Sequence, residues 1–460
     1  MIMKRIFTFI CTCTLLVLAG CDFGGSSTDV GTGDCSVTGQ NATIKTVMQD
    51  WYLFYPQLNP NSDPADPNFL DIQSFLADLV ADVIPTDRFS FVYSMQDELD
   101  FQSATYAGLG FVVGVLPGND VRLKDVYGEL PGEQQTPASV AGLKRGFKIT
   151  AIEGVSTDDI INNRPAGTSE TAAITAAFGA RDPGVVVNLD YLDTLGVAGS
   201  ATMTKEVIQF STVPLYSVFD LNGRITGYLN FRSFADPSYE ELRQAFIEFN
   251  SQGVTNLVID VRYNGGGLVS VAEYLGDLLL GNLVSGSIFM QEVFNDKHSS
   301  SNYTSYVFTD ANSLSDLQRV VFITTSRSAS ASELMINAML PVPGLETATV
   351  GATSYGKPVG SYGFTFCDQV LRPVTFKAVN AAGNSDYFDG FPPTCTADDN
   401  LDYAIGDQAE DSLAAALAWI DTGACPLAGA ADATLLKAKQ TYLKQETDNM
   451  NYRELVQNYQ

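Results

Sequence analysis

The 460-residue chain is poor in histidine and in positive charge, and each shortage argues against a class of function. Its single histidine, His298, stands in a polar segment, residues 295–300, that is predicted to be an exposed loop. A Ser-His-Asp triad would have to use this histidine, so chemistry of that kind is disfavoured. Lysine and arginine total 26 residues against 53 aspartates and glutamates, for a net charge of −27. This balance argues against nucleic acids and anionic membrane surfaces as partners.

The N-terminus has an apolar run, residues 6–18, that is too short for an ordinary membrane-spanning helix. Lys4 and Arg5 precede it, so residues 1–20 are predicted to be a signal peptide. The residues before and including Cys21 resemble the bacterial lipobox, which implies that Cys21 is lipidated; an ordinary signal peptide cut nearby is the alternative. Residues 21–35 would then form a flexible tether. We expect a lipid-anchored protein of the cell envelope that faces the periplasm. Asp22 resembles an inner-membrane retention signal of some bacteria, and the choice between inner and outer membrane is left open.

The cysteines contain no CxxC pair, which together with the single histidine argues against a metal site. We expect neither a metal nor a cofactor. Cys11 and Cys13 fall in the signal peptide, which leaves four cysteines besides Cys21. In an oxidising compartment four cysteines predict two disulfides, with three possible connectivities. We predict one disulfide that closes a local loop and one that joins the start of the folded region to its end: Cys367–Cys395 and Cys35–Cys425.

A stretch of small residues and serines, residues 328–333, follows the buried apolar run 320–323 and precedes a helical pattern of apolar residues. A hydroxyl at a helix start lies beside backbone N–H groups that can stabilise an oxyanion. Lys357 returns on a glycine-flanked turn, and a lysine buried without a counter-charge can act as a base. The pattern therefore suggests a serine–lysine hydrolase. The alternative is a helix cap made of Ser328, Ser330 and Ser332, with Glu333 completing a capping box.

A second apolar run, residues 257–261, is typical of a strand buried on both faces. It is followed by Gly265, Gly266 and Gly267, and a helix is predicted to begin near Leu268. Neither GK[ST] nor GxGxxG spacing is present, so a phosphate loop is not supported. The glycines predict a backbone that must approach another group closely.

Residues 98–210 carry two further motifs in order. The first is Gly108, Leu109, Gly110 and Phe111, and the second spans residues 136–146. The pair resembles a PDZ domain. The resemblance implies that the GLGF backbone binds a peptide C-terminal carboxylate while a strand edge accepts the peptide by β-augmentation. The alternative is a PDZ shell that only packs against its neighbour.

Taken in order, the GLGF loop, the second PDZ motif, the glycine turn, the serine cluster and the Ser-Tyr-Gly-Lys-Pro segment resemble the C-terminal processing, or tail-specific, protease family of Ser-Lys serine peptidases. The resemblance extends over residues 51–418. It implies Ser330 as nucleophile, Lys357 as general base, and the amides of Gly266 and Ala331 as oxyanion donors. Ser361 is a weaker candidate for the polar residue that orients the lysine.

The resemblance implies an α+β multidomain chain. Its expected parts are an N-terminal helical region at 36–97, a PDZ domain (a β-rich partial barrel with helices) at 98–210, an α/β crotonase/ClpP-like catalytic domain at 211–425 and a helical tail at 426–460. The predicted function is an endopeptidase that cleaves exported polypeptides and captures their C-terminal tails. The alternative is a non-catalytic peptide- or ligand-binding protein on the same fold. The oligomeric state is left open.

Overall fold

The structure is a computed structural model that describes residues 27–31, 33–83, 87–426, 430–448, 450 and 452–453. The predicted signal peptide and Cys21 lie outside the described residues. Among the helices that are described, none combines the length and apolar character needed to cross a bilayer.

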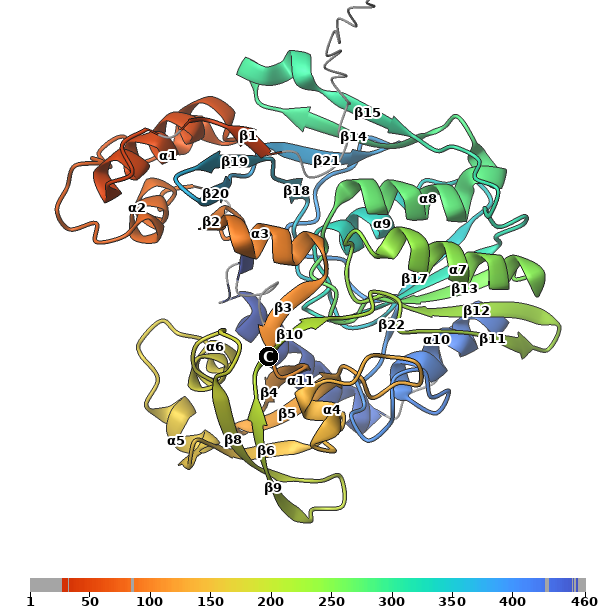
Figure 1. The fold of residues 1–460 in the computed structure, drawn as a ribbon. Helices are drawn as coiled ribbons and strands as arrows, with labels where there is room; N and C mark the ends of the chain where they lie inside the picture. The colour runs from red at the N-terminus through yellow and green to blue at the C-terminus, as the bar shows by residue number, and fades with distance from the viewer. Residues whose placement is uncertain are drawn as a thin grey trace, which may run out of the picture.

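A six-stranded sheet forms the centre of the largest unit (Figure 1). The first two strands of the sheet run antiparallel to each other, and each later strand runs parallel to the strand before it. The strands are, in spatial order, β11 (Leu215–Leu221), β12 (Arg224–Asn230), β13 (Asn256–Asp260), β16 (Arg319–Thr324), β17 (Glu346–Gly351) and β22 (Cys395–Thr396). The two predicted buried strands are confirmed as β13 and β16, which lie side by side.

Helices cover both faces of this sheet, and the alternation of side chains along the strands explains why. Leu257 and Ile259 of β13 join one apolar cluster with α7 (Ser238–Ser251), α8 (Val269–Val284) and α9 (Ala331–Met339). Val258 points to the opposite face and joins a second cluster with α10 (Asp411–Thr422). A strand apolar on both sides is stable only between two such layers. The core therefore requires the continuous apolar runs seen in the sequence.

The strands of the N-terminal region lie in one sheet with strands from much later in the chain. It contains α1 (Val37–Trp51), η1 (Tyr55–Gln57), α2 (Ile72–Leu79) and α3 (Met95–Gln102). A four-stranded sheet beside these helices consists of β1 (Ser27–Asp29), β19 (Gly363–Phe366), β20 (Gln369–Arg372) and β2 (Phe91–Ser94). A neighbouring sheet consists of β15 (Tyr303–Tyr306), β14 (Ile288–Phe294), β21 (Phe376–Asn380) and β18 (Val359–Gly360). The segment that follows Lys357 therefore packs directly against the N-terminal helices.

Residues 105–209 form a separate β-rich unit. The strands β3 (Thr105–Gly108) and β10 (Glu206–Gln209) pair where the chain enters and leaves it. Its antiparallel sheet contains β4 (Phe111–Leu116), β5 (Asp120–Val126), β6 (Lys148–Ile152), β7 (Val155–Ser156), β8 (Val186–Leu192) and β9 (Ala198–Thr204). Its helices are α4 (Pro137–Val140), α5 (Thr157–Asn162) and α6 (Glu170–Ala177). The unit has an apolar core of its own, which allows it to hold its shape beside the larger sheet.

Both disulfide pairings predicted from the sequence are wrong. The structure joins Cys35 to Cys367 and Cys395 to Cys425, with Cα atoms 5.7 and 5.3 Å apart. The prediction paired cysteines by their distance along the chain, whereas β-sheet pairing decides their distance in space. β1 lies parallel to β19, which brings Cys35 to the residue that follows β19. Cys395 begins the edge strand β22, and Cys425 follows α10, which packs on the same sheet.

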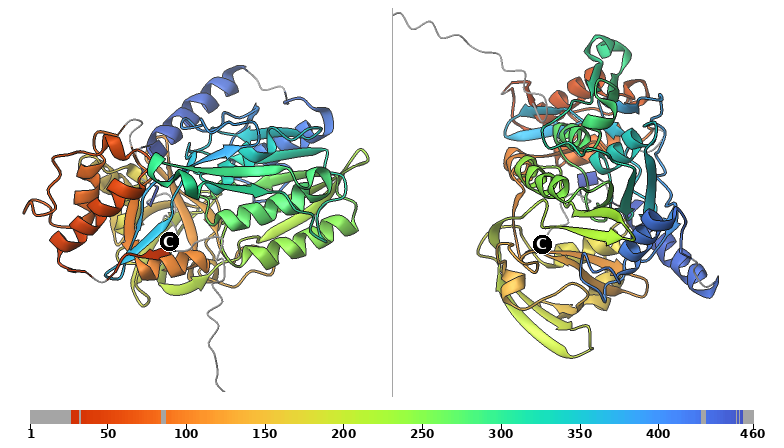
Figure 2. Two further views of the ribbon diagram at one scale, coloured as in Figure 1. Left: turned by 90° about the horizontal axis from the view of Figure 1, so that it is seen from above. Right: turned by 90° about the vertical axis from the view of Figure 1, so that its right-hand side faces the viewer.

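The last described helix, α11 (Ala430–Asp448), lies along the outside of the molecule (Figure 2). Gln440 donates to the carbonyl groups of Gly351 and Ala397, at 2.9 and 3.0 Å, where β17 and β22 end. Tyr442 donates to Glu170 of the β-rich unit. The helix therefore contacts both units.

Candidate active site

The turn between β16 and α9 presents one serine and buries its two neighbours. Ser328 Oγ donates to the carbonyl of Val261 at 2.6 Å, and Ser332 Oγ donates to the carbonyl of Asn264 at 3.1 Å. Both serines are fully buried. Ser330 is half-buried, lines a cavity and has φ 55° and ψ −114°, a conformation that costs energy for a residue with a side chain. Among the three serines, the geometry leaves Ser330 as the hydroxyl available for chemistry.

The glycine turn lies directly against this serine. Gly266 has φ 106°, and a Cβ placed on it would lie 2.8 Å from Ser330 Cβ and 2.9 Å from the nitrogen of Ala331. The predicted close approach of the glycine backbone is therefore confirmed, and the group it approaches is Ser330. Ala331 is the first residue of α9, so its N–H belongs to the helix turn whose amides have no intrahelical acceptor.

The amide of Gly266 does not face an open position. It donates to Asn264 Oδ1 at 2.8 Å, and the Asn264 amide group in turn donates to the carbonyl of Phe231 at 2.9 Å. Asn264 is fully buried, so this pair is shielded from water. The expected oxyanion donor is thus near Ser330 but engaged in an internal hydrogen bond.

Glu333 connects the serine turn to the lysine turn. Its Oε2 accepts from the N–H of Ser330 at 3.1 Å and from the N–H of Lys357 at 2.8 Å. Its Oε1 accepts from the N–H of Gly356 at 2.6 Å and from Ser354 Oγ at 2.5 Å. Burial raises the pKa of this carboxyl, while these four donors lower it. The capping-box pattern located Glu333 at a helix start, but only the fold shows its second set of partners.

Lys357 is 4% exposed and follows Gly356, whose φ is 94°. Burial places the pKa of its amine well below the usual value, and the nearby Arg372 lowers it further, against smaller opposing effects of Asp87 and Glu333. A lysine of this kind loses its proton readily and can accept another. Its Nζ lies 3.2 Å from the ring centroid of Tyr452.

Ser330 and Lys357 line the same cavity, whose volume is about 370 Å³. Ser361 also lines it, but its hydroxyl is buried without a hydrogen-bond partner among the described residues and makes no contact that orients the lysine. The rest of the cavity wall combines aromatic and charged side chains, among them Phe91, Phe101, Arg181, Glu273, Glu292, Tyr303, Tyr362 and Arg372. Burial raises the pKa of Glu292 to about 7. The space suits an amphipathic ligand such as a peptide segment.

The GLGF loop lies outside this cavity, although β3 reaches the cavity through Thr105, Tyr106 and Ala107. Gly108, Leu109, Gly110 and Phe111 are all buried. The carbonyl of Leu109 accepts from the N–H of Ala138 at 2.8 Å. Gly110 has φ 98° and packs so closely on Thr136 that a side chain would not fit. The two motifs of residues 98–210 therefore contact each other.

His298 lies away from the cavity, in η2 (Asp296–Ser301). The predicted fully exposed position is not observed, because its ring stacks on Trp51 with centroids 3.6 Å apart, and its Nε2 lies 3.2 Å from Asp50. This histidine packs η2 onto α1 and cannot serve as a base for Ser330.

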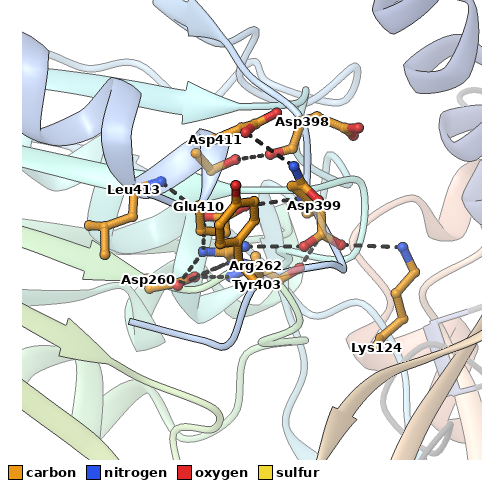
Figure 3. Close-up of polar contacts among 12 residues, drawn as sticks. Lys124, Asp260, Arg262, Asp398, Asp399, Tyr403, Glu410, Asp411 and Leu413 are labelled. Carbon is orange, nitrogen blue, oxygen red and sulfur yellow. Dashed lines mark hydrogen bonds and ion pairs between the residues drawn. The ribbon is translucent and has the colours of Figure 1, made fainter. Parts of the chain in front are cut away.

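A buried charge cluster joins the two units behind the glycine turn (Figure 3). Arg262 follows β13 and pairs with Asp260 at 2.8 Å, Glu410 at 3.0 Å and Asp399 at 3.1 Å. From the β-rich unit, Arg145 and Lys124 reach the same Asp399 at 2.6 and 3.2 Å. Burial raises the pKa of Asp399, but Arg145 and Lys124 outweigh it and hold that pKa well below its usual value. The position of the β-rich unit is thereby tied to the strand that leads into Gly265–Gly267.

Residues 225–396 match peptidase family S41. The chain is 26% identical over 239 residues to the carboxyl-terminal-processing protease of Picosynechococcus, covering 52% of this chain and 51% of that protein. It is 24% identical over 303 residues to the carboxy-terminal processing protease CtpB of Bacillus subtilis, covering 65% and 56%. These matches confirm the resemblance predicted from the motifs.

A crystal structure of an S41-type protease from Bacteroides fragilis has the same fold, with a TM-score of 0.62, 23% identity, and coverage of 83% of this chain and 97% of that one. The likeness confirms a mixed α/β multidomain fold. The chain spans about half the length of the curated relatives it matches.

Proposed function

We propose that this chain, which carries a peptidase family S41 region, is a serine-type endopeptidase with a Ser330–Lys357 dyad. The observation that carries the proposal is that Ser330 and Lys357 line one cavity while Glu333 binds the backbone of both. The buried Lys357, whose pKa is lowered, supplies the base, a role that the chain's single histidine, His298, is not placed to fill.

In the proposed reaction, Ser330 Oγ attacks a peptide carbonyl carbon and its proton passes to Lys357 Nζ. The resulting oxyanion is stabilised by the amide of Ala331 and, after its release from Asn264 Oδ1, by the amide of Gly266. The protonated lysine then donates its proton to the leaving amine, which leaves an acyl-serine. Water then attacks the ester carbonyl while Lys357 Nζ accepts a proton from it. The lysine returns that proton to Ser330 Oγ as the carboxylic product leaves, which restores the starting state.

The β-rich unit is proposed to act as a PDZ domain that captures the C-terminal tail of a polypeptide substrate. Its β4 is the end strand of the sheet, which is the position that β-augmentation requires. The neighbouring β3 leads into the catalytic cavity, so a tail held on this unit would lie close to Ser330. Gly108–Phe111 are packed against Thr136 and α4, so carboxylate binding would require the loop to open.

Export and lipid anchoring through Cys21 are also proposed. The support is the pair of disulfides, since such bonds persist mainly in oxidising compartments. Metabolic labelling with an alkyne fatty acid tests the anchor: wild type should be labelled, and Cys21→Ala should lose the label. Equal labelling of both proteins would contradict lipidation of Cys21.

The peptidase assignment is tested by digestion of an unstructured protein and by labelling with a serine-reactive fluorophosphonate. Ser330→Ala and Lys357→Ala should lose both activities, whereas His298→Ala should keep them. Equal cleavage by wild type and Ser330→Ala would remove the assignment. A wild type that binds tail peptides but neither cleaves nor reacts would support the alternative, a non-catalytic peptide-binding protein.

A further inference from the structure

A tyrosine from the C-terminal end of the chain lies inside the catalytic cavity. Tyr452 is 6% exposed and lines the cavity together with Ser330 and Lys357. It comes from the residues after α11, more than ninety positions beyond the lysine turn. Neither the family motifs nor the local pattern around residue 452 predicts a contribution to this site.

Tyr452 contacts both halves of the proposed machinery. Its ring face lies 3.2 Å from Lys357 Nζ, and its hydroxyl donates to the carbonyl of Gly265 at 2.7 Å. A ring face attracts the protonated form of an amine, and the protonated form cannot act as a base. The tyrosine therefore lies over the amine that would accept the proton of Ser330.

The hydroxyl contact also affects the oxyanion donor. Gly265 C=O and Gly266 N–H belong to one planar peptide unit. Tyr452 holds the carbonyl end, and Asn264 Oδ1 holds the N–H end at 2.8 Å. With both ends bonded, the amide of Gly266 is directed to Asn264. Rotation of this peptide unit would break both hydrogen bonds, and the loss of Tyr452 would remove one of them.

The surrounding contacts make this position specific. Tyr355 Oη donates to the carbonyl of Met450 at 3.1 Å, and the N–H of Tyr452 donates to the carbonyl of Arg88 at 2.8 Å. Met450 is 3% exposed. Ser326, in the turn that leads to Ser330, shares a hydrogen bond of 2.8 Å with Thr447 of α11. Thr447 and Met450 are thus attached to the turns that carry Ser330 and Lys357.

We propose that the catalytic cavity binds Tyr452 of the chain's own C-terminal segment, residues 450–453, which competes with substrate and holds the site inactive through this tyrosine. The proposal rests on the proposed peptidase function. In the bound state the Tyr452 ring occupies the wall at Lys357, and its hydroxyl keeps the Gly265–Gly266 peptide unit turned towards Asn264. Departure of the segment opens the wall and frees this peptide unit to rotate.

The first experiment measures the rate of fluorophosphonate labelling at Ser330 in full-length variants. Tyr452→Ala should label about tenfold faster than wild type. Tyr452→Phe, which keeps the ring but loses the bond to Gly265, should lie between them. Tyr306→Ala, at an exposed tyrosine of β15, is the control for loss of a tyrosine and should label at the wild-type rate. A Tyr452→Ala rate equal to or below that of wild type would overturn the proposal, with melting temperatures checking that each variant is folded.

The second experiment does not depend on catalysis and uses full-length chains that carry Ser330→Ala. A fluorescent peptide with the sequence of residues 448–456 is titrated while its anisotropy is recorded. It should bind the Ser330→Ala/Tyr452→Ala chain about tenfold more tightly than the Ser330→Ala chain, whose own tyrosine occupies the site. A peptide with alanine in place of the tyrosine should bind neither. Equal affinities of the native peptide for the two chains would overturn the proposal, even if labelling had shown that the peptidase assignment itself fails.

Discussion

The main-chain N–H groups of Ser330 and Lys357 donate to the same carboxylate oxygen, Glu333 Oε2, at 3.1 and 2.8 Å. The two residues are carried by different turns, one before α9 and one after β17, and Glu333 is the side chain that both turns share. An error near 1 Å in the placement of reacting groups can lower a rate by about a hundredfold. The spacing of the proposed nucleophile and base is therefore controlled by a residue that need not touch the substrate.

Glu333→Gln tests this arrangement. Glutamine has the same shape, but its amide nitrogen cannot accept from the N–H groups that one carboxylate oxygen now serves. We expect kcat to fall about 10- to 100-fold with little change in KM, because the dyad shifts while the cavity wall remains. Unfolding by urea should show a loss of about 1–3 kcal/mol for the unsatisfied buried groups. Glu346→Gln, on an exposed residue of β17, is the control, and a kcat equal to that of the control would contradict the role of Glu333.

The pH dependence of activity should follow Lys357. In the proposed mechanism the neutral amine is the base, so kcat/KM should rise as pH increases through the pKa of Lys357, which burial and Arg372 hold well below the usual lysine value. Arg372→Gln removes a positive charge near the amine and makes protonation easier. We therefore expect the rising limb of the pH profile to move to higher pH in this variant.

Arg372→Lys is the matched control for the pH profile, because it keeps the charge and shortens the side chain. Its rising limb should stay near that of wild type. A limb that moves equally in the glutamine and lysine variants would mean that Arg372 acts through its contacts with Glu98 and not through its charge on Lys357.

Gly266→Ala tests the close approach of the glycine turn to Ser330. A methyl group would lie 2.8 Å from Ser330 Cβ, and the φ of 106° is unfavourable for alanine. We expect activity to fall more than about a hundredfold, since the turn must move away from Ser330, the proposed nucleophile. Gly286→Ala is the matched control. Gly286 has φ 83°, but a Cβ there would have no neighbouring atom within 4 Å, so this variant has the backbone strain without the clash. Equal activity of the two variants would show that the approach is not required.

Local patterns predicted the parts of the site whose partners lie nearby in sequence. The apolar runs predicted β13 and β16, since a strand between two helical layers must be apolar on both faces. The small residues around Ser330 and the glycines at 265–267 also pointed to the correct turns. The local pattern alone could not separate Ser328 and Ser332 from Ser330, because their acceptors, the carbonyls of Val261 and Asn264, belong to another strand and turn. The family resemblance had implied Ser330.

Contacts between distant segments could not be predicted in this way. Glu333 matched a capping box, but its bonds to Gly356 and Lys357 depend on how α9 faces the lysine turn. The disulfides were mispaired because chain separation was used where the pairing of β1 with β19 decides the geometry. Tyr452 stands in a polar C-terminal sequence with no motif, so its place beside Lys357 follows only from the path of α11.

The disulfide pairing predicts a specific peptide map. Non-reducing digestion should yield a Cys35–Cys367 peptide and a Cys395–Cys425 peptide. The first bond closes a loop of 332 residues and the second a loop of 30, so each should stabilise the chain by constraining the unfolded state. We expect Cys35→Ala/Cys367→Ala and Cys395→Ala/Cys425→Ala to lose about 3–5 kcal/mol each in urea unfolding. A Cys367–Cys395 peptide would contradict the structure.

Asp399 should hold the β-rich unit against the larger sheet. Asp399→Asn leaves Arg145, Lys124 and Arg262 buried with one shared counter-charge fewer, so we expect a loss of about 3–5 kcal/mol in unfolding free energy. Because the native pKa of Asp399 lies well below that of the unfolded chain, its contribution is complete above about pH 4 and is lost as pH falls through the native pKa. The difference between wild type and variant should therefore be constant from about pH 5 to pH 8. Asp402→Asn, at an exposed residue of the same loop, provides the control, and an unfolding midpoint equal to that of this control would show that the units are held together by other contacts.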